Sequence, residues 1–413
     1  MTTHPLLWNR HFTLWWLGNA QSALGGALAG IALSFLVLHE TGSSGAMGVN
    51  LALTLLPTLL SPLAGALVDR LPVRLPLIVL NVVRGGAQLL LGLAALHGPV
   101  GVPALHALAL LNGLIAAFYV PASMGVTPRL VAPQHRARAA SLMQGSAQIM
   151  QLAGLLGGGL LVSALGSGPS LMFDGMTFLL MAALLRAVQV PDPRARGARS
   201  SVRADLQAGV QYTRSSAALL LLPGLALIIN AVLAPMEMLL PARMTALGVG
   251  AGGFGLFLGL FTGGMASSSL LLAALGARVP ARLGGVLGFA LSGGMFALLS
   301  VTRTAPQMYA LAFACGAAIA LLNISLSLTF QTLVHPEYYG RVGSLLNTAG
   351  QIGMPVTLLL LAPIADRVPL ALIFSVTAAV LLLAAALWHA VMRRTPDAVI
   401  TPATVRAVDA RAA

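Results

Sequence analysis

Long hydrophobic segments separated by short polar turns follow one another along almost the whole chain. Twelve of them approach or exceed the roughly 20 residues that an α-helix needs to cross the hydrocarbon core of a bilayer. Their centres lie near Gly26, Pro57, Leu89, Leu114, Leu152, Leu180, Ile229, Gly263, Gly293, Ala318, Val356 and Leu382. The pattern predicts an all-α polytopic membrane protein with twelve transmembrane helices.

The longest polar interruption, at residues 191–216, leaves six hydrophobic segments on each side. Val202, Leu206 and Val210 fall on one helical face of this segment. The segment is therefore either a linker with a short amphipathic helix on the inner membrane surface or an exposed tether. We expect four parts: a first half at 1–190, the cytoplasmic linker at 191–216, a second half at 217–392 and a cytoplasmic tail at 393–413.

Composition and charge support a membrane protein and set its orientation. Hydrophobic residues make up 58% of the 413 residues and charged residues only 8%, which excludes a soluble globule with a solvated surface. The net charge is +13, and all 23 residues counted as Lys or Arg are arginine. If the N-terminus is inside and the spans alternate, 19 of these arginines lie on the inner side. This asymmetry predicts a multi-pass protein of the inner membrane with both termini cytoplasmic, and it does not indicate nucleic-acid binding.

The sequence has few of the residues that enzymes and metal sites require. Cys315 is the only cysteine, which excludes an internal disulfide and a cysteine-based zinc site. Without lysine the chain has neither a Walker A phosphate loop nor a lysine Schiff base, and the motifs His-Glu-x-x-His and Gly-x-Ser-x-Gly are absent. We therefore expect no enzyme activity, no cofactor and no metal.

Two phrases of the first half return in the second. "ALVDRLPVR" at 66–74 returns as "ALGARVPAR" at 274–282, and "LVAPQHRARAASLMQGSAQI" at 130–149 returns as "LVHPEYYGRVGSLLNTAGQI" at 333–352. The offsets are 208 and 203 residues, and all four copies fall between spans on the predicted inner side. Two echoes at nearly one offset predict an internal parallel repeat, in which two six-helix halves are related by an axis along the membrane normal.

Several of these phrases carry a family resemblance. "GALVDRLPVR" from Gly65 resembles the Gly-x-x-x-Asp-Arg-x-x-x-Arg signature in the loop after the second helix of the major facilitator superfamily. "LHETGSS", "YVPASMGVTPRLVAP", "FDGMTF" and "LVHPEYYGRV" extend the resemblance along most of the chain. Together they are similar to the branch that contains macrolide-efflux proteins and the enterobactin exporter.

The resemblance implies the two-half fold of that superfamily and a transport function. It implies secondary active efflux of a small amphipathic molecule, of drug, macrolide or siderophore type, by alternating access in exchange for protons. The expected partners are then the small substrate, protons and the lipid bilayer, and we expect a monomer. The alternatives are a lipid flippase and a non-transporting membrane scaffold with the same fold.

The signature Gly65, Asp69, Arg70 and Arg74 is implied to form a gating motif. By resemblance, Asp69 faces the cytoplasmic start of the eleventh span. A carboxylate at a helix N-terminus is stabilised by about 0.3–1 kcal/mol, which would hold the inner side shut. Ala277 breaks the second copy of the signature. The other interpretation is that Asp69 and its arginines are only topology signals.

Three charged residues lie inside predicted spans, where such groups are costly and normally functional. Arg84 and Asp174 fall at compatible depths, so they form either an ion pair within the first half or part of a substrate site. Without an ATP-binding loop, export needs an ion gradient, and an ionised Asp174 is a poor proton carrier. Glu237 has no basic residue in its own span, so we predict that it is the proton-coupling residue. Glu237 could also be an acid near the outer interface.

Polar side chains on the first, fourth, seventh and tenth spans can supply hydrogen bonds to a substrate. The resemblance places these four spans around the central cavity. Some of the side chains could instead tie helices together. The candidate cavity residues are Asn19, Gln21, Asn112, Tyr119, Asn230 and Asn323.

Overall fold

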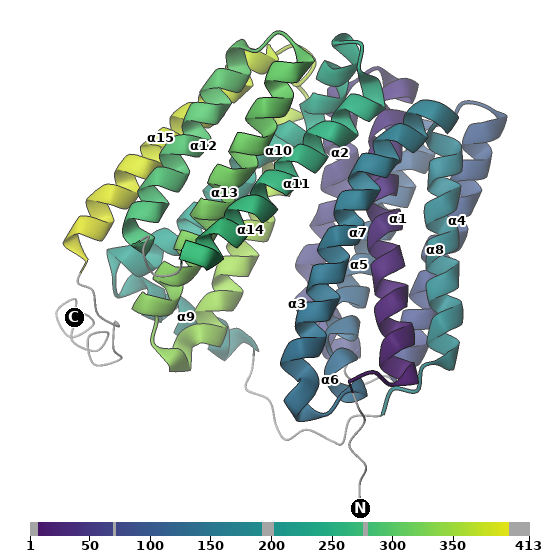
Figure 1. Ribbon diagram of the computed structural model, residues 1–413, viewed down its shortest axis with the longest axis horizontal. Helices are drawn as coiled ribbons and strands as arrows, with labels where there is room; N and C mark the ends of the chain where they lie inside the picture. Colours follow the sequence, from purple (N-terminus) through teal and green to yellow (C-terminus); the bar gives the residue numbers. More distant parts are fainter. Residues whose placement is uncertain (1–6, 69–71, 192–201, 276–279, 396–413) are drawn as a thin grey trace, which may run out of the picture. The chain divides into compact units, whose positions relative to one another are not determined.

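The computed structural model describes residues 7–68, 72–191, 202–275 and 280–395 (Figure 1). Within these residues the secondary structure is helical, without a β-strand. Twelve helical segments are long and apolar enough to cross a membrane, which confirms the predicted number of spans. Large apolar side chains such as Leu63, Leu90 and Leu270 are more than 70% exposed, as residues that face lipid are.

The first six spans contain eight α-helices and two short 3₁₀ segments in the described residues. They are α1 (Arg10–Thr41), α2 (Ser44–Leu55), η1 (Leu56–Leu60), α3 (Ser61–Val68), α4 (Arg74–His97), α5 (Val102–Met124), α6 (Thr127–Leu130), η2 (Pro133–His135), α7 (Arg136–Leu165) and α8 (Ser167–Ala187). The second span is divided into α2, η1 and α3 because Pro57 cannot donate a helical hydrogen bond. The sharp turn from α1 into α2 uses Gly42, whose φ is 64°.

The later part of the chain begins with the linker helix α9 (Val202–Arg214). It continues through α10 (Ala217–Ala246), α11 (Gly250–Leu275), α12 (Ala281–Val301), α13 (Ala305–Leu333), η4 (Pro336–Tyr338), α14 (Tyr339–Leu361) and α15 (Leu370–Arg394). A helix thus lies within the predicted linker. Three residues are predicted to form the apolar face of this helix. The side chains of two of them, Val202 and Leu206, lie outside the part of the chain that the structure describes.

The chain separates into two compact units. The first contains Met1–Ala195, Met238–Gly259 and Leu361–Ala365, and the second contains Arg196–Glu237, Leu260–Leu360 and Asp366–Ala413. The first unit is therefore larger than the predicted first half. One reason is that the first ten residues of α11 pack closely against α7. A β-carbon on Gly159 of α7 would lie 2.7 Å from the carbonyl oxygen of Ala251 of α11. The two backbones approach this closely because neither has a side chain between them.

The most extensively packed helix pair of the first unit is α4 with α8, which lie side by side in Figure 1. A β-carbon on Gly85 would lie 2.8 Å from the carbonyl oxygen of Gly175, and one on Gly175 would lie 2.8 Å from that of Gly85. Gly92 and Gly168 make the same reciprocal approach, at 2.7 and 2.9 Å. We call these four residues the glycine seam; any larger side chain there would force the helices apart.

The two copies of the first repeated phrase end in arginines with equivalent roles. Arg74 donates from Nε to the carbonyl oxygen of Leu185 at 3.0 Å and from Nη2 to that of Arg186, at the C-terminal end of α8. Arg282 donates from Nη1 to the carbonyl oxygen of Met392 at 2.8 Å, at the C-terminal end of α15. Each arginine binds carbonyl oxygens in the last turn of the last helix of its half, where the helix dipole also favours a cation.

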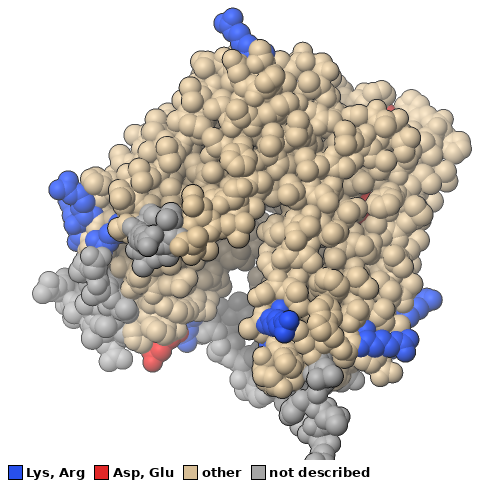
Figure 2. Space-filling view, viewed as in Figure 1, with Lys and Arg blue, Asp and Glu red and all other residues tan. Residues whose placement is uncertain are grey.

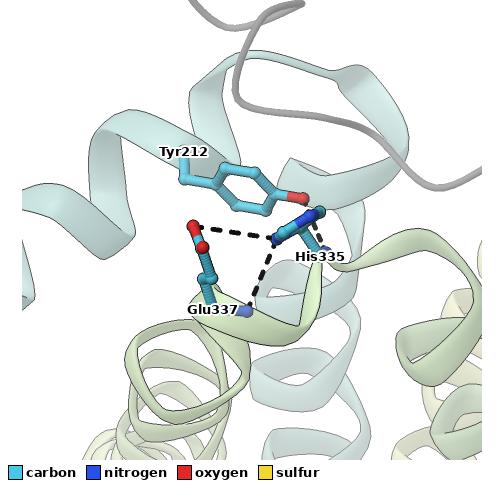
Figure 3. Close-up of polar contacts among 3 residues, drawn as sticks. All are labelled: Tyr212, His335 and Glu337. Atoms are coloured by element: carbon cyan, nitrogen blue, oxygen red, sulfur yellow. Dashed lines mark hydrogen bonds and ion pairs between the residues drawn. The ribbon is translucent and has the colours of Figure 1, made fainter.

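The second repeated phrase also keeps its local structure. Pro133 begins the 3₁₀ turn η2 before α7, and Pro336 begins η4 before α14. In the second copy this turn holds the linker helix (Figure 3). The ring of Tyr212 on α9 stacks on Tyr338 with centroids 4.1 Å apart, and its hydroxyl oxygen accepts a hydrogen bond from the backbone N–H of His335 at 2.9 Å. Burial raises the pKa of Tyr212, so the hydroxyl stays neutral.

Candidate functional site

A cavity of about 860 Å³ lies within the first compact unit. Its walls come from α1, α4, α5, α6, α7 and α8, which share one bundle in Figure 1. The size is within the range of small-molecule sites. Its polar lining residues are Asn19, Ser22, Asn81, Arg84, Tyr119, Thr127, Arg136, Gln144 and Gln151. The rest of the lining is apolar, formed mainly by alanine and methionine with Leu80, Ile115 and Phe178.

Arg84 is the charged side chain deepest in the cavity wall. It is the eleventh residue of α4, about 15 Å along the helix axis from Arg74. Its guanidinium lies over the ring of Phe178 on α8, 4.2 Å from the ring centroid. Its Nε is buried and has no hydrogen-bond partner. The ring supports the cation by a cation–π contact but leaves its hydrogen-bonding capacity unused.

Of the two alternatives for Arg84 and Asp174, the ion pair is not formed: no oxygen of Asp174 lies within 4.0 Å of the guanidinium. Asp174 is fully buried and accepts hydrogen bonds from Gln88 Nε2 at 3.2 Å and from Thr177 Oγ1 at 3.4 Å. The two charges still attract each other. The reason for the separation is that Phe178, one turn further along α8, holds the guanidinium at the cavity wall.

The structure divides the predicted cavity residues of the first half into two groups. Asn19 and Tyr119 line the cavity, and the Asn19 side chain also donates to the carbonyl oxygen of Trp15 at 2.8 Å. Gln21 lies outside the lining and donates to the carbonyl oxygen of Thr177 at 2.8 Å, so it ties α1 to α8. Asn112 is buried in α5, also outside the lining.

The remaining candidates lie in the second unit and do not line this cavity. Asn230 donates to the carbonyl oxygen of Ala226 at 2.9 Å within α10. The side chain of Asn323 is exposed on α13. Glu237 on α10 is also exposed, and among the described residues it makes no hydrogen bond or ion pair. A carboxyl within a span that no protein group pairs can exchange a proton wherever water reaches it.

Two of the four residues of the predicted gating motif lie within the described residues and two do not. Asp69 and Arg70 lie outside the described residues, and so does Ala277 in the second copy. Gly65 is near the end of α3, where a β-carbon would lie 3.3 Å from Cβ of Pro121 on α5. Arg74 caps α8, as described above.

Sequence reasoning missed the face that α7 contributes to the cavity. Arg136, Ala140, Met143, Gln144, Ala147 and Gln151 all line it. These positions recur at intervals of three or four residues, the spacing of one helical face. That periodicity is the available signal, but from the sequence the arginines on the inner side are interpreted only as determinants of membrane topology.

The electrostatic character of the cavity is positive. Arg84 and Arg136 line it, and no Asp or Glu is among its lining residues. The described part of the chain contains no group of three His, Cys, Asp or Glu side chains that could hold a metal ion. The surface in Figure 2 is almost entirely uncharged across its middle, with blue arginine atoms near its edges. The charged wall is therefore an exception in an apolar protein.

Comparisons with known proteins agree with this architecture. The profile of the Major Facilitator Superfamily matches residues 15–358. Macrolide efflux protein A of Streptococcus pyogenes is 24% identical over 384 residues, which cover 87% of this chain and 91% of that protein. The uncharacterized MFS-type transporter YkuC of Bacillus subtilis (strain 168) is 24% identical over 378 residues, covering 86% of this chain and 85% of YkuC.

Solved structures share the fold at lower identity. The nucleoside transporter NupG has a TM-score of 0.75 at 11% identity, covering 94% of this chain and 100% of NupG. A bacterial homolog of the human lysosomal transporter Spinster, inward-facing and unoccupied, has a TM-score of 0.70 at 13% identity, covering 92% of this chain and 96% of the homolog. Twelve spans, a repeated two-half sequence and a family profile that covers most of the chain lead to one assignment. The chain belongs to the Major Facilitator Superfamily.

Proposed function

We propose that the protein is a secondary active exporter of amphipathic small molecules in the cytoplasmic membrane, with both termini in the cytoplasm. The observation that carries the proposal is the cavity of about 860 Å³, whose wall combines polar side chains with alanine and methionine. Such a wall suits a molecule with one polar and one apolar part. The macrolide efflux protein among its relatives supports export and a drug-like substrate.

Energy for export comes, in this proposal, from exchange with protons. The sequence has no lysine for a Walker A loop, so the usual route to ATP is closed. Glu237 is our candidate for the proton-coupling residue because its side chain is exposed and unpaired within the described residues. Asp174 is a poorer candidate because it is fully buried and hydrogen-bonded to Gln88 and Thr177.

The gate in this proposal is the signature loop after α3. Asp69 would stabilise the closed inner side by its charge at the N-terminus of a facing helix, worth about 0.3–1 kcal/mol. Arg70 would lie at the lipid phosphates, where it helps to orient the span. These roles follow from the family signature.

Reconstitution tests the proposal directly. Purified protein in proteoliposomes is given an imposed pH gradient and a panel of amphipathic dyes of both charges, and dye accumulation is measured together with proton flux. Accumulation that needs the gradient, accompanied by proton counterflow, supports a proton-coupled exporter. Movement of a fluorescent phospholipid without movement of any dye would instead identify a lipid flippase.

A further inference from the structure

The cavity wall has an imbalance of charge that export of neutral molecules does not require. Arg84 and Arg136 line the cavity and no acidic side chain does. Burying a cation at the depth of a membrane span is costly, and the cost is normally offset by a partner or used for function. The protein offers Arg84 only part of a partner, because Asp174 attracts it but makes no ion pair with it.

The geometry around Arg84 leaves room for a ligand. One face of the guanidinium is covered by Phe178 at 4.2 Å from the ring centroid. Its Nε is buried without a hydrogen-bond partner. A guanidinium presents donors in a planar fork that matches the two oxygens of a carboxylate. With its face fixed by the ring, this fork is already oriented before a ligand arrives, so little conformational entropy is lost on binding.

Asp174 does not compete for this position. Its oxygens accept from Gln88 and Thr177, and it is fully buried behind the cavity wall. It lowers the cost of keeping Arg84 charged, and it leaves the cavity side of the guanidinium unoccupied. Arg136, at the first turn of α7, then adds a second cation to the same cavity with no acid beside it in the lining.

The rest of the lining fits the remainder of an amphipathic molecule. Gln144 can donate from its amide, and Ile115, Met124 and Met143 supply apolar surface. Methionine side chains adapt to ligands of different shape. We propose that the cavity binds amphipathic organic anions, with the carboxylate of the substrate on Arg84 and Arg136 attracting it into the cavity. This inference rests on the proposed export function, and it names the substrate class of the same site.

The test uses three fluorescent probes that share a dansyl group and an undecyl chain and end in a carboxylate, a primary amide or an amine. Binding to the full chain in nanodiscs of neutral lipid is measured by anisotropy at neutral pH, with empty nanodiscs subtracted. We expect the carboxylate to bind about tenfold more tightly than the amide, the effect of one charge-assisted contact, and the amine to bind most weakly. Equal binding of the three probes, or tighter binding of the amine, would overturn the inference.

Variants locate the site. Arg84→Gln should remove the preference for the carboxylate, and Arg84→Lys should keep most of it because the charge remains. If Arg84→Gln does not fold, substitutions of Arg136 and Arg138, both exposed on α7, test whether the carboxylate binds in the cavity. Arg138 is two residues away on α7 and does not line the cavity. Arg136→Gln should weaken carboxylate binding about threefold, and Arg138→Gln should not. Equal losses in both would show a surface effect and contradict the site.

Two further arms separate this inference from the proposed function and from a lipid ligand. Adding phosphatidylglycerol to the nanodiscs should leave carboxylate binding within twofold; strong competition would make a lipid headgroup the occupant and overturn the small-molecule class. In proteoliposomes, pH-driven accumulation of the amine but not of the carboxylate contradicts the anion site and leaves export standing. A carboxylate preference in binding without transport of any probe contradicts export and leaves the anion site standing.

Discussion

The two copies of the second repeated phrase share their secondary structure, but their side chains make different contacts. In both, a proline opens a 3₁₀ turn that leads into a long helix, η2 into α7 and η4 into α14. The first copy belongs to the cavity, because Arg136 and Gln144 of α7 line it. At the position equivalent to Arg136, the second copy has Tyr339, whose hydroxyl donates to the carbonyl oxygen of Gln331 at 2.8 Å.

The second copy is an anchor for the linker helix. Tyr338 stacks on Tyr212 of α9. His335 donates its backbone N–H to the Tyr212 hydroxyl, as Figure 3 shows. A β-carbon on Gly209 would lie 3.1 Å from the carbonyl oxygen of Arg341, so α9 lies directly against the start of α14. The repeat thus preserves a turn and a helix, while the side chains differ: those of the first copy line the cavity, and those of the second hold the linker helix.

The largest expected effect is on proton coupling, and it is expected in the second unit, whereas the proposed substrate site lies in the first. If the first unit binds the substrate and Glu237 of the second unit carries the proton, Glu237→Gln should abolish pH-driven accumulation because it cannot exchange a proton. Binding of the carboxylate probe should stay within twofold of the wild type. Both are measured on the same protein preparation, by dye uptake and by anisotropy. Accumulation that still follows the imposed pH gradient would return the role to Asp174 or to another ion.

Exchanging the equivalent side chains of the two copies tests the comparison most directly. Arg136→Tyr makes the first copy resemble the second and removes a cation from the cavity. Transport of the carboxylate probe at low substrate concentration should fall about threefold from the lost charge, as for Arg136→Gln, and to about one tenth in all because a bulky ring also replaces a flexible side chain in the cavity wall. Tyr339→Arg makes the reverse change outside the cavity, and transport should stay within twofold. Initial rates in proteoliposomes, normalised to the amount of folded protein, measure both. Equal effects of the two substitutions would show that the copies are not specialised.

The other repeated phrase offers a smaller effect. Asp69→Asn removes the proposed latch charge without creating a cavity, and a loss of about 0.3–1 kcal/mol corresponds to roughly a two- to fivefold fall in transport. The amount of folded protein should not change. Reactivity of a cysteine introduced at the inner end of α14 reports whether the inner side has become more open. If transport and reactivity are both unchanged, Asp69 is a topology residue.

The smallest effect on transport is expected at the anchor. Tyr212→Ala removes both the ring stack and the hydrogen bond, which together contribute about 1–3 kcal/mol to the docking of α9. Tyr212→Phe keeps the stack and should lose only about 0.5–1.5 kcal/mol. Limited proteolysis within the linker should therefore be faster in the order wild type, Tyr212→Phe, Tyr212→Ala, while transport changes less than twofold. Equal cleavage rates would show that the stack does not hold the helix.

The span pattern could be predicted because bilayer thickness fixes the length of an apolar helix, and the repeats could be read as matching letters. The direction in which each side chain points could not be predicted from the sequence. Asn19 and Tyr119 line the cavity as expected, whereas Gln21, only two residues from Asn19, is turned to Thr177 by helix packing. Equal depth suggested that Arg84 meets Asp174, but depth says nothing about rotation around the helix. The bond from His335 to Tyr212 joins residues 123 positions apart, and no local pattern signals it.

The glycine seam has a consequence for how a bound molecule leaves. Arg84 immediately precedes Gly85 on α4, and Phe178 is three residues beyond Gly175 on α8, so the cation and its supporting ring are both carried by helices that leave no space to slide past each other. Close packing of α4 and α8 keeps Arg84 and Phe178 at fixed positions relative to each other. If an organic anion binds the guanidinium as proposed above, movement of one of these helices along the other would not release it, and release would need water to replace the oxygens of the ligand. Ligand release would then depend on the entry of water into the cavity, and the rate at which Arg84 becomes hydrated would limit the rate of release.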